Sequence, residues 1–265
     1  DRTVEFLNNT KEKMASQLFC AMCSFGDPHS PFAPPAPYCY DYDPVDVPPP
    51  LSREGELDDL PPHFRAMVEQ DIMTSGNKSQ AMNATAPYYA ECAAHYYGII
   101  NLVDEQVGRI LDYLSEMGQR DNTLVVFTSD HGETLGDHGL IQKGCRFYEG
   151  LVRVPLIFSW PGHLQEGVRS NALVELTDKA PTFLELAGLG VPERMHGRSL
   201  APLLRGDRDN HHHRAFVRCE YYDALEEPDH SCATMFRDER HKLVVYHGHG
   251  LGELYDLEED PNEFE

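Results

Sequence analysis

A long amphipathic helix that leads into a short buried strand is the feature that most constrains the fold of this chain. Between residues 88 and 117 apolar side chains recur at steps of three and four, which is the pattern of one buried helix face. Gly118 favours a helix end there, and residues 124–128 form a short apolar, β-branched run. A helix that feeds such a strand is typical of α/β proteins. We therefore predict an α/β fold with a mainly parallel sheet flanked by helices.

Other parts of the sequence extend this body. The apolar run at residues 17–25 predicts a buried strand, and residues 156–160 predict another. Residues 178–189 predict a helix, and the first residues read as the tail of one. Residues 31–62 are dense in proline and acidic residues, which favours a long irregular segment.

The pattern changes after residue 211. Short runs with strand character alternate there with polar turns, at residues 215–221, 233–237, 242–246 and 253–256. They predict a small antiparallel sheet appended to the body. We expect two domains, an α/β body over residues 1–210 and an antiparallel subdomain over residues 211–265.

Charge and hydropathy exclude two classes of protein. The chain has 22 basic and 44 acidic residues, a net charge of −22, which repels the phosphates of nucleic acids. No apolar run approaches the ~20 residues that a membrane span needs. An anionic substrate would therefore require a local positive pocket or a metal ion.

The seven cysteines do not form a regular framework. Cys20 and Cys23 have the spacing of a redox or zinc motif, but they lie inside the apolar run at residues 17–25. A strand would point the two thiols to opposite faces. We therefore predict that both side chains are buried in packing.

The strongest candidate for chemistry directly follows the strand at residues 124–128, where the chain reads Ser129-Asp130-His131-Gly132. Ligands of parallel α/β sheets bind at the carboxyl ends of strands. A carboxylate and an imidazole can share one metal ion there, and Gly132 would allow a sharp turn. The alternative is an ordinary loop with a structural histidine, because both residue types are common in loops.

Two further groups could complete an anion site. A second Asp-His-Gly contains His138, and the cations Lys143 and Arg146 follow it. Together they would form a positive pocket that stabilises developing negative charge; the alternative is a solvated basic loop. His29 follows the strand predicted at residues 17–25, between two prolines that stiffen its loop. If the two strands are neighbours, His29 would lie at the same edge of the sheet as Asp130 and His131.

Six different short motifs follow one another along nearly the whole chain. They are SFGDPHSPF at residues 24–32, FTSDHG at 127–132, LGDHG at 135–139, VPLI at 154–157, HGRSL at 196–200 and ELYDL at 253–257. The ordered set resembles the sulfatase family of the alkaline phosphatase superfamily. The resemblance implies an alkaline-phosphatase-like α/β fold and hydrolysis of sulfate esters.

The resemblance also implies roles for individual residues. Asp130 and His131 match two ligands of the family's divalent metal, usually Ca²⁺, although an imidazole ligand also suits Mn²⁺ or Zn²⁺. Lys143 matches a lysine that contacts the sulfate group and the bridging oxygen. His29 matches a histidine that contacts the ester and is a candidate proton donor to the leaving group. His138 and Arg146 are assigned to substrate binding.

One departure from the family pattern matters. The family's nucleophile is a Cys or Ser in Cys/Ser-x-Pro-x-Arg that is oxidised to formylglycine, and no Cys or Ser of this chain has that context. We expect the formylglycine upstream of residue 1, in an N-terminal part that would be this chain's main partner. On this interpretation the chain is the C-terminal two-thirds of a sulfatase, and it is inactive when isolated.

Three functions stay open at this point. The first is metal-dependent hydrolysis of a carbohydrate or aryl sulfate ester. The second is hydrolysis of a phosphonate or phosphate monoester on the same scaffold, and the third is non-catalytic binding of sulfated sugars or of a partner. By family analogy a periplasmic, secreted or lysosomal location is favoured.

Overall fold

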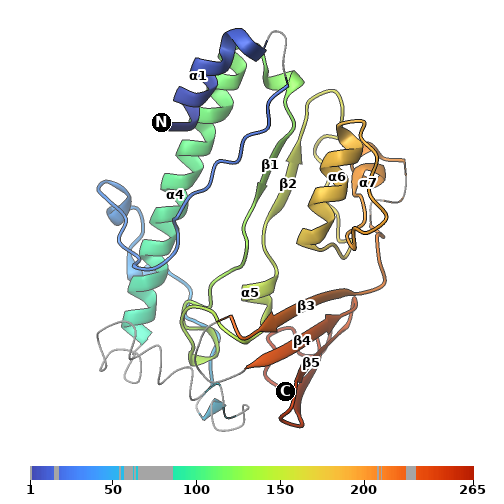
Figure 1. The fold of residues 1–265 in the computed structure, drawn as a ribbon. Helices are drawn as coiled ribbons and strands as arrows, with labels where there is room; N and C mark the ends of the chain where they lie inside the picture. Colours follow the sequence, from blue (N-terminus) through green and yellow to red (C-terminus); the bar gives the residue numbers. More distant parts are fainter. Residues whose placement is uncertain are drawn as a thin grey trace. The chain divides into compact units, whose positions relative to one another are not determined.

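The structure is a computed structural model with two compact units (Figure 1). The first unit comprises residues 1–50 and 85–124, and the second comprises residues 51–84 and 125–265. Within them the structure describes residues 2–14, 18–53, 55–56, 62, 64, 86–207, 209, 211–224 and 231–265. The units divide the chain elsewhere than at residue 210, so the predicted domain boundary stays a prediction.

The first unit is built around two helices, α1 (Arg2–Met14) and α4 (Ala86–Glu116). Helix α4 confirms the prediction for residues 88–117, and the Tyr113 hydroxyl donates a hydrogen bond to Asn8 Oδ1 of α1 at 2.9 Å. Short 3-10 turns complete the unit: η1 (Tyr38–Tyr40), η2 (Pro44–Asp46) and η3 (Arg120–Asn122). Among the described residues, no helix is long and apolar enough to cross a membrane.

The prediction of a buried strand at residues 17–25 is wrong for the described residues 18–25. They are assigned to no strand, and Leu18 and Met22 are 98% and 92% exposed. Cys20 and Cys23 are also exposed, so the predicted burial of these thiols is wrong as well. The physical reason is that no described strand pairs with this segment, and an apolar run without a partner has nothing to be buried against.

The proline-rich segment that follows is irregular, as predicted for its described part, and it is fastened to α4. The Tyr38 hydroxyl donates to Glu105 Oε2 at 2.6 Å, and Asn101 Nδ2 donates to Asp41 Oδ2 at 2.9 Å. At Gly98 the backbone of the segment comes so close that an added Cβ would lie 2.3 Å from the Tyr38 carbonyl oxygen. Glycine is therefore required at this position of the helix.

We predict opposite effects for two glycine-to-alanine changes in α4. Gly108 has nothing within 4 Å of an added Cβ, so Gly108→Ala should stabilise the unit by up to about 1 kcal/mol through helix propensity. Gly98→Ala gains the same propensity but forces a backbone contact apart, so it should destabilise by about 1–2 kcal/mol net. Urea unfolding of both variants measures the difference, and equal stabilities would contradict the close packing of Tyr38 on α4.

The second unit contains a two-stranded sheet of β1 (Val125–Thr128) and β2 (Leu156–Ser159). Both strands occur where they were predicted, but they pair antiparallel, with Val125 opposite Ser159. The expected parallel arrangement is therefore wrong for this pair. The reason is the connection, which contains loops, a 3-10 turn at residues 137–139 and the four-residue helix α5 (Glu149–Val152). Such a connection returns the chain in the opposite direction beside β1.

The C-terminal part of this unit confirms the predicted small antiparallel sheet. Its four strands pair in sequence order: β3 (Val217–Tyr222), β4 (Cys232–Arg237), β5 (His241–Tyr246) and β6 (Leu251–Asp256). Further helical elements among the described residues of the unit are short: η4 (Asp137–Gly139), η5 (Leu176–Asp178), α6 (Lys179–Leu186) and α7 (Ala201–Arg205). Helix α6 agrees with the helix predicted at residues 178–189.

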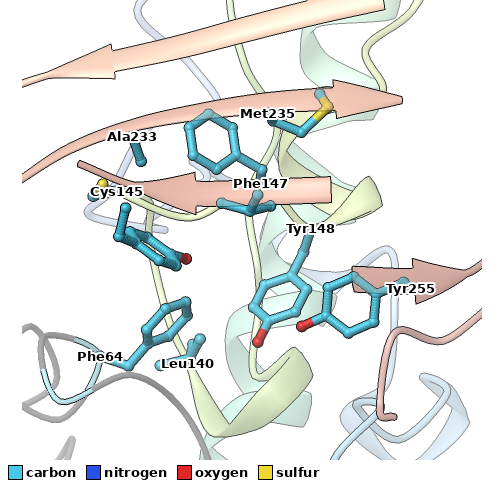
Figure 2. Close-up of a cluster of buried hydrophobic side chains, with 10 residues drawn as sticks. Phe64, Leu140, Cys145, Phe147, Tyr148, Ala233, Met235 and Tyr255 are labelled. Atoms are coloured by element: carbon cyan, nitrogen blue, oxygen red, sulfur yellow. The ribbon is translucent and has the colours of Figure 1, made fainter. Parts of the chain in front are cut away.

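One face of the four-stranded sheet forms the core of the unit (Figure 2). Ala233, Met235 and Val244 meet Phe147 and Tyr148, which come from the loop before α5. The alternation of buried and exposed residues along β4 and β5 explains why only one face contributes. The core thus ties the chain that follows β1 to the C-terminal sheet.

A buried lysine reinforces this connection. Lys242 of β5 is fully buried, and its Nζ lies 2.8 Å from the Phe147 carbonyl, 2.6 Å from Glu263 Oε1 and 2.8 Å from Glu149 Oε1. Burial acts to raise the pKa of Glu149, but the charge and hydrogen bond of Lys242, together with the charges of Arg237 and Arg153, outweigh it and hold that pKa below its usual range. The buried ammonium is therefore compensated by carboxylates at the start of α5 and near residue 265.

Candidate active site

Asp130 and His131 follow the last residue of β1 and are held in one tight turn. The His131 amide donates to Asp130 Oδ1 at 3.0 Å, and Ser129 Oγ donates to the His131 carbonyl at 2.8 Å. The two side chains stay accessible, with 86% of Asp130 and 41% of His131 exposed. Burial opposes ionisation of Asp130, but His131 and the surrounding N–H groups outweigh it and lower its pKa. The carboxylate is thus charged at neutral pH.

The hydrogen bonding of His131 determines which ring nitrogen can bind a cation. Its Nδ1 lies 2.8 Å from the Gly132 carbonyl, and a carbonyl can only accept, so Nδ1 carries the proton. In the neutral ring Nε2 then has the free lone pair, as in metal-bound histidines whose other nitrogen is fixed by a backbone carbonyl.

The separation of the two donor atoms is compatible with a shared ion. His131 Nε2 lies 3.8 Å from Asp130 Oδ2. Two ligand atoms at about 2.3 Å from one ion can be at most ~4.6 Å apart. No group of three or more His, Cys, Asp or Glu suited to a metal occurs among the described residues. Asp130 and His131 would supply two ligands, whereas Ca²⁺ takes about six to eight.

Gly132 is required because α5 packs closely against it, and not because the chain turns sharply there. Its amide donates to the Leu151 carbonyl at 2.8 Å, and a Cβ at this position would lie 1.9 Å from the Gly150 carbonyl oxygen. Helix α5 therefore supports the turn that carries Asp130 and His131. We did not predict this contact from the sequence, because α5 is short and lies well beyond the motif.

Lys143 ends a loop with unusual backbone geometry. Six residues between positions 135 and 144 have positive φ, and three of them are not glycine: Leu135 (50°), His138 (58°) and Gln142 (66°). Such conformations cost about 1–3 kcal/mol each and persist only where surrounding contacts enforce them. Lys143 itself is half-buried, and its charge counteracts the burial that raises the pKa of Glu133.

Arg146 holds the backbone of this loop. Arg146 is 3% exposed, and its Nη2 donates to the Lys143 carbonyl at 2.8 Å and to the Ile141 carbonyl at 3.2 Å. At the other side of the loop, Thr134 Oγ1 donates to the Gln142 carbonyl at 3.0 Å. The predicted contact of Arg146 with substrate finds no support in this buried position.

His138 is also buried, and it has a partner that the sequence did not reveal. Its Nδ1 donates to Glu56 Oε1 at 2.5 Å, and its ring stacks on Tyr148 with 3.7 Å between centroids. Glu56 precedes it by 82 residues in the proline-rich acidic segment, where no local signal marks it. These contacts give His138 a packing role, and its predicted contact with substrate is not supported by this geometry.

His29 lies in the first unit, on the turn that follows residues 18–25. Its amide donates to the Gly26 carbonyl at 3.2 Å, and its Nδ1 donates to the Ser30 carbonyl at 2.7 Å. As at His131, Nδ1 therefore carries the proton of the neutral ring, and the side chain is exposed. The other predicted site residues belong to the second unit.

Comparison with protein families matches the whole chain. The model described as "Sulfatase" matches residues 1–189, and the model described as "N-sulphoglucosamine sulphohydrolase, C-terminal" matches residues 136–265. Among curated proteins, an arylsulfatase of Clostridium perfringens is 31% identical over 99% of this chain and 51% of its own length. An N-acetylglucosamine-6-O-sulfatase of Bacteroides thetaiotaomicron is 37% identical over 66% of this chain and 32% of its own.

Comparison with solved structures agrees. A phosphonate monoester hydrolase from Silicibacter pomeroyi superposes with a TM-score of 0.84 at 28% identity, over 96% of this chain and 53% of that protein. This similarity confirms the predicted α/β class. The chain spans about half the length of the arylsulfatase and of the phosphonate hydrolase.

Proposed function

The chain belongs to the sulfatase family, a family of hydrolases, and we propose that its protein hydrolyses a sulfate ester with a divalent metal ion. The observation that carries the proposal is the arrangement at the end of β1. There Asp130 and His131 present an ionised carboxylate and a free Nε2 at 3.8 Å from each other. The activity belongs to the whole protein, of which this chain would supply part of the active site.

In this proposal Asp130 and His131 are two of the metal ligands. A bound cation, most plausibly Ca²⁺ with Mn²⁺ and Zn²⁺ as alternatives, would neutralise charge on the sulfate oxygens. The fit rests on one hard oxygen donor beside an imidazole nitrogen whose tautomer is fixed by the Gly132 carbonyl. The family resemblance further suggests a formylglycine in an N-terminal part, which would provide the nucleophile.

The remaining two residues would act on the ester itself. Lys143 would place a positive charge next to the sulfate group and the bridging oxygen. His29 would act as an imidazolium, with its Nδ1–H donated to the Ser30 carbonyl and its Nε2–H delivered to the leaving oxygen. Both roles come from the family resemblance, and the hydrogen bond of His29 supports the second.

The substrate class we propose is a sulfated carbohydrate. It is suggested by the relative named N-acetylglucosamine-6-O-sulfatase, which is 37% identical. A phosphonate monoester is the second candidate, favoured by the structural similarity to a phosphonate monoester hydrolase. We also propose that the protein acts in the periplasm, the lysosome or outside the cell, by analogy with the family.

The experiment compares two matched esters in the full-length protein. We expect hydrolysis of 4-nitrophenyl sulfate to exceed that of 4-nitrophenyl phenylphosphonate in kcat/KM, with activity lost on chelation and restored by Ca²⁺, Mn²⁺ or Zn²⁺. N-acetylglucosamine-6-sulfate with sulfate release as the readout tests the carbohydrate class. Preference for the phosphonate would select the second candidate. No turnover of either ester would reject the enzyme function and leave the binding role.

A further inference from the structure

We propose that Glu56 and His138 act as a clamp that positions Lys143 for catalysis, in place of any contact between His138 and substrate. The inference rests on the proposed function. It assigns a role to Glu56, which lies far from every catalytic motif in the sequence. The strained loop that carries Lys143 and the contacts that hold it support this role.

The clamp joins the loop to the segment at residues 51–56 through three polar contacts. His138 Nδ1 donates to Glu56 Oε1 at 2.5 Å, and the His138 amide donates to the Leu51 carbonyl at 2.6 Å. In return the Leu51 amide donates to Asp137 Oδ1 at 2.8 Å. The second oxygen of Glu56 accepts the Arg53 amide at 3.2 Å, so both carboxylate oxygens are used.

The clamp is buried and packed on both sides. The side chains of Glu56 and His138 are 5% and 4% exposed. The His138 ring stacks on Tyr148 with an interplanar angle of 7°, and Phe264 lies 5.4 Å from it. Tyr148 belongs to the core of the second unit. The loop is thus fixed to the rigid part of the unit through His138.

This anchoring matters because the loop is not held by regular secondary structure. His138 sits at φ 58°, and Gln142, directly before Lys143, sits at φ 66°. Without enforcement, non-glycine residues relax from this region toward ordinary conformations. Relaxation at either position would rotate the backbone that carries Lys143. The Lys143 carbonyl, held by Arg146, then could not keep its place relative to Asp130 and His131.

The test is a double-mutant cycle in the full-length protein. Glu56→Ala removes the acceptor of His138 and should lower kcat/KM for 4-nitrophenyl sulfate roughly tenfold or more, since small displacements of catalytic groups have effects of this size. Glu56→Gln keeps one acceptor oxygen and should lose less. In a Lys143→Ala background Glu56→Ala should cost less than about threefold, because residues that act through each other are not additive. Equal losses in both backgrounds would overturn the proposal.

A matched control and a second readout separate positioning from general destabilisation. Glu175→Ala removes another carboxylate of the same unit, which pairs with Arg214 at 2.7 Å and contacts no residue of the loop. It should leave kcat/KM within about threefold. Hydrogen exchange of the amides at residues 136–140 should accelerate in Glu56→Ala and not in Glu175→Ala. Unchanged exchange there would contradict the clamp.

The outcomes of these experiments also distinguish failure of the proposed function from failure of the clamp. A wild-type protein without turnover of any sulfate or phosphonate ester rejects the proposed function. An active wild type with additive losses in the cycle rejects only the clamp. If Glu56→Ala does not fold, Glu56→Gln replaces it in the same cycle, with the same requirement that its loss shrinks when Lys143 is absent.

Discussion

Replacing Lys143 with alanine in the full-length protein is expected to lower kcat/KM for a sulfate ester by roughly 10² to 10³-fold. The reason is electrostatic: the Lys143 ammonium would lie where negative charge develops on the sulfate group and the bridging oxygen. A preorganised charge at such a place acts in the transition state, so kcat should fall more than KM rises. Steady-state kinetics with 4-nitrophenyl sulfate measures both constants.

Lys179→Ala is the matched control for this variant. Lys179 begins α6 in the same unit, distant in sequence from the motifs that contain the proposed site residues. It should keep kcat/KM within about twofold of the wild type, as expected of a substitution away from the site. If Lys143→Ala kept wild-type turnover, the catalytic role proposed for Lys143 would be refuted. Half-burial of its side chain would then be enough to explain its place in the loop.

Gly132→Ala is expected to have the second large effect, a loss of about 3 kcal/mol in the free energy of unfolding, at the upper end for overpacking. Its added Cβ would lie 1.9 Å from the Gly150 carbonyl oxygen, and backbone atoms cannot move aside as a flexible side chain can. The turn that carries Asp130 and His131 would have to leave α5. Metal affinity should therefore fall together with stability, which titration of the apo-protein with Ca²⁺ measures.

Gly150→Ala tests the same contact from the other side. An added Cβ there would lie 3.6 Å from the Glu133 carbonyl oxygen, which is an ordinary contact. We expect this variant to change stability by less than about 1 kcal/mol and to keep its affinity for the metal. If Gly132→Ala were as stable as Gly150→Ala, the packing of α5 against the turn would be refuted.

The sequence predicted those elements whose signals are local. Helix α4 and the four C-terminal strands have a complete periodic pattern within their own residues, so their positions were predicted closely. The direction of β2 relative to β1 was not, because it depends on how the connecting chain returns. The run at residues 17–25 has the composition of a buried strand, but burial also requires a partner strand, and composition does not provide one.

The same distinction applies to the candidate site. Asp130, His131 and Lys143 were predicted as site residues from short motifs and from the family resemblance, and their roles stay predictions. Their supports were missed: Glu56 and α5 act across long stretches of chain, and a buried carboxylate in an acidic, proline-rich segment looks like a solvated one. His138 shows the converse case. Its place in a second Asp-His-Gly suggested substrate contact, which stays a prediction, while in the structure its ring is buried against Tyr148 and Phe264.

The central claim is that His29, Lys143, Asp130 and His131 serve one sulfate ester. The most direct measurement is an experimental structure of the full-length protein with its metal and inorganic sulfate. We expect one ion bound by Asp130 Oδ2 and His131 Nε2, with Lys143 Nζ and His29 Nε2 both within about 3.2 Å of the same sulfate. A sulfate held by other residues, or an ion that either Asp130 or His131 does not ligate, would contradict it.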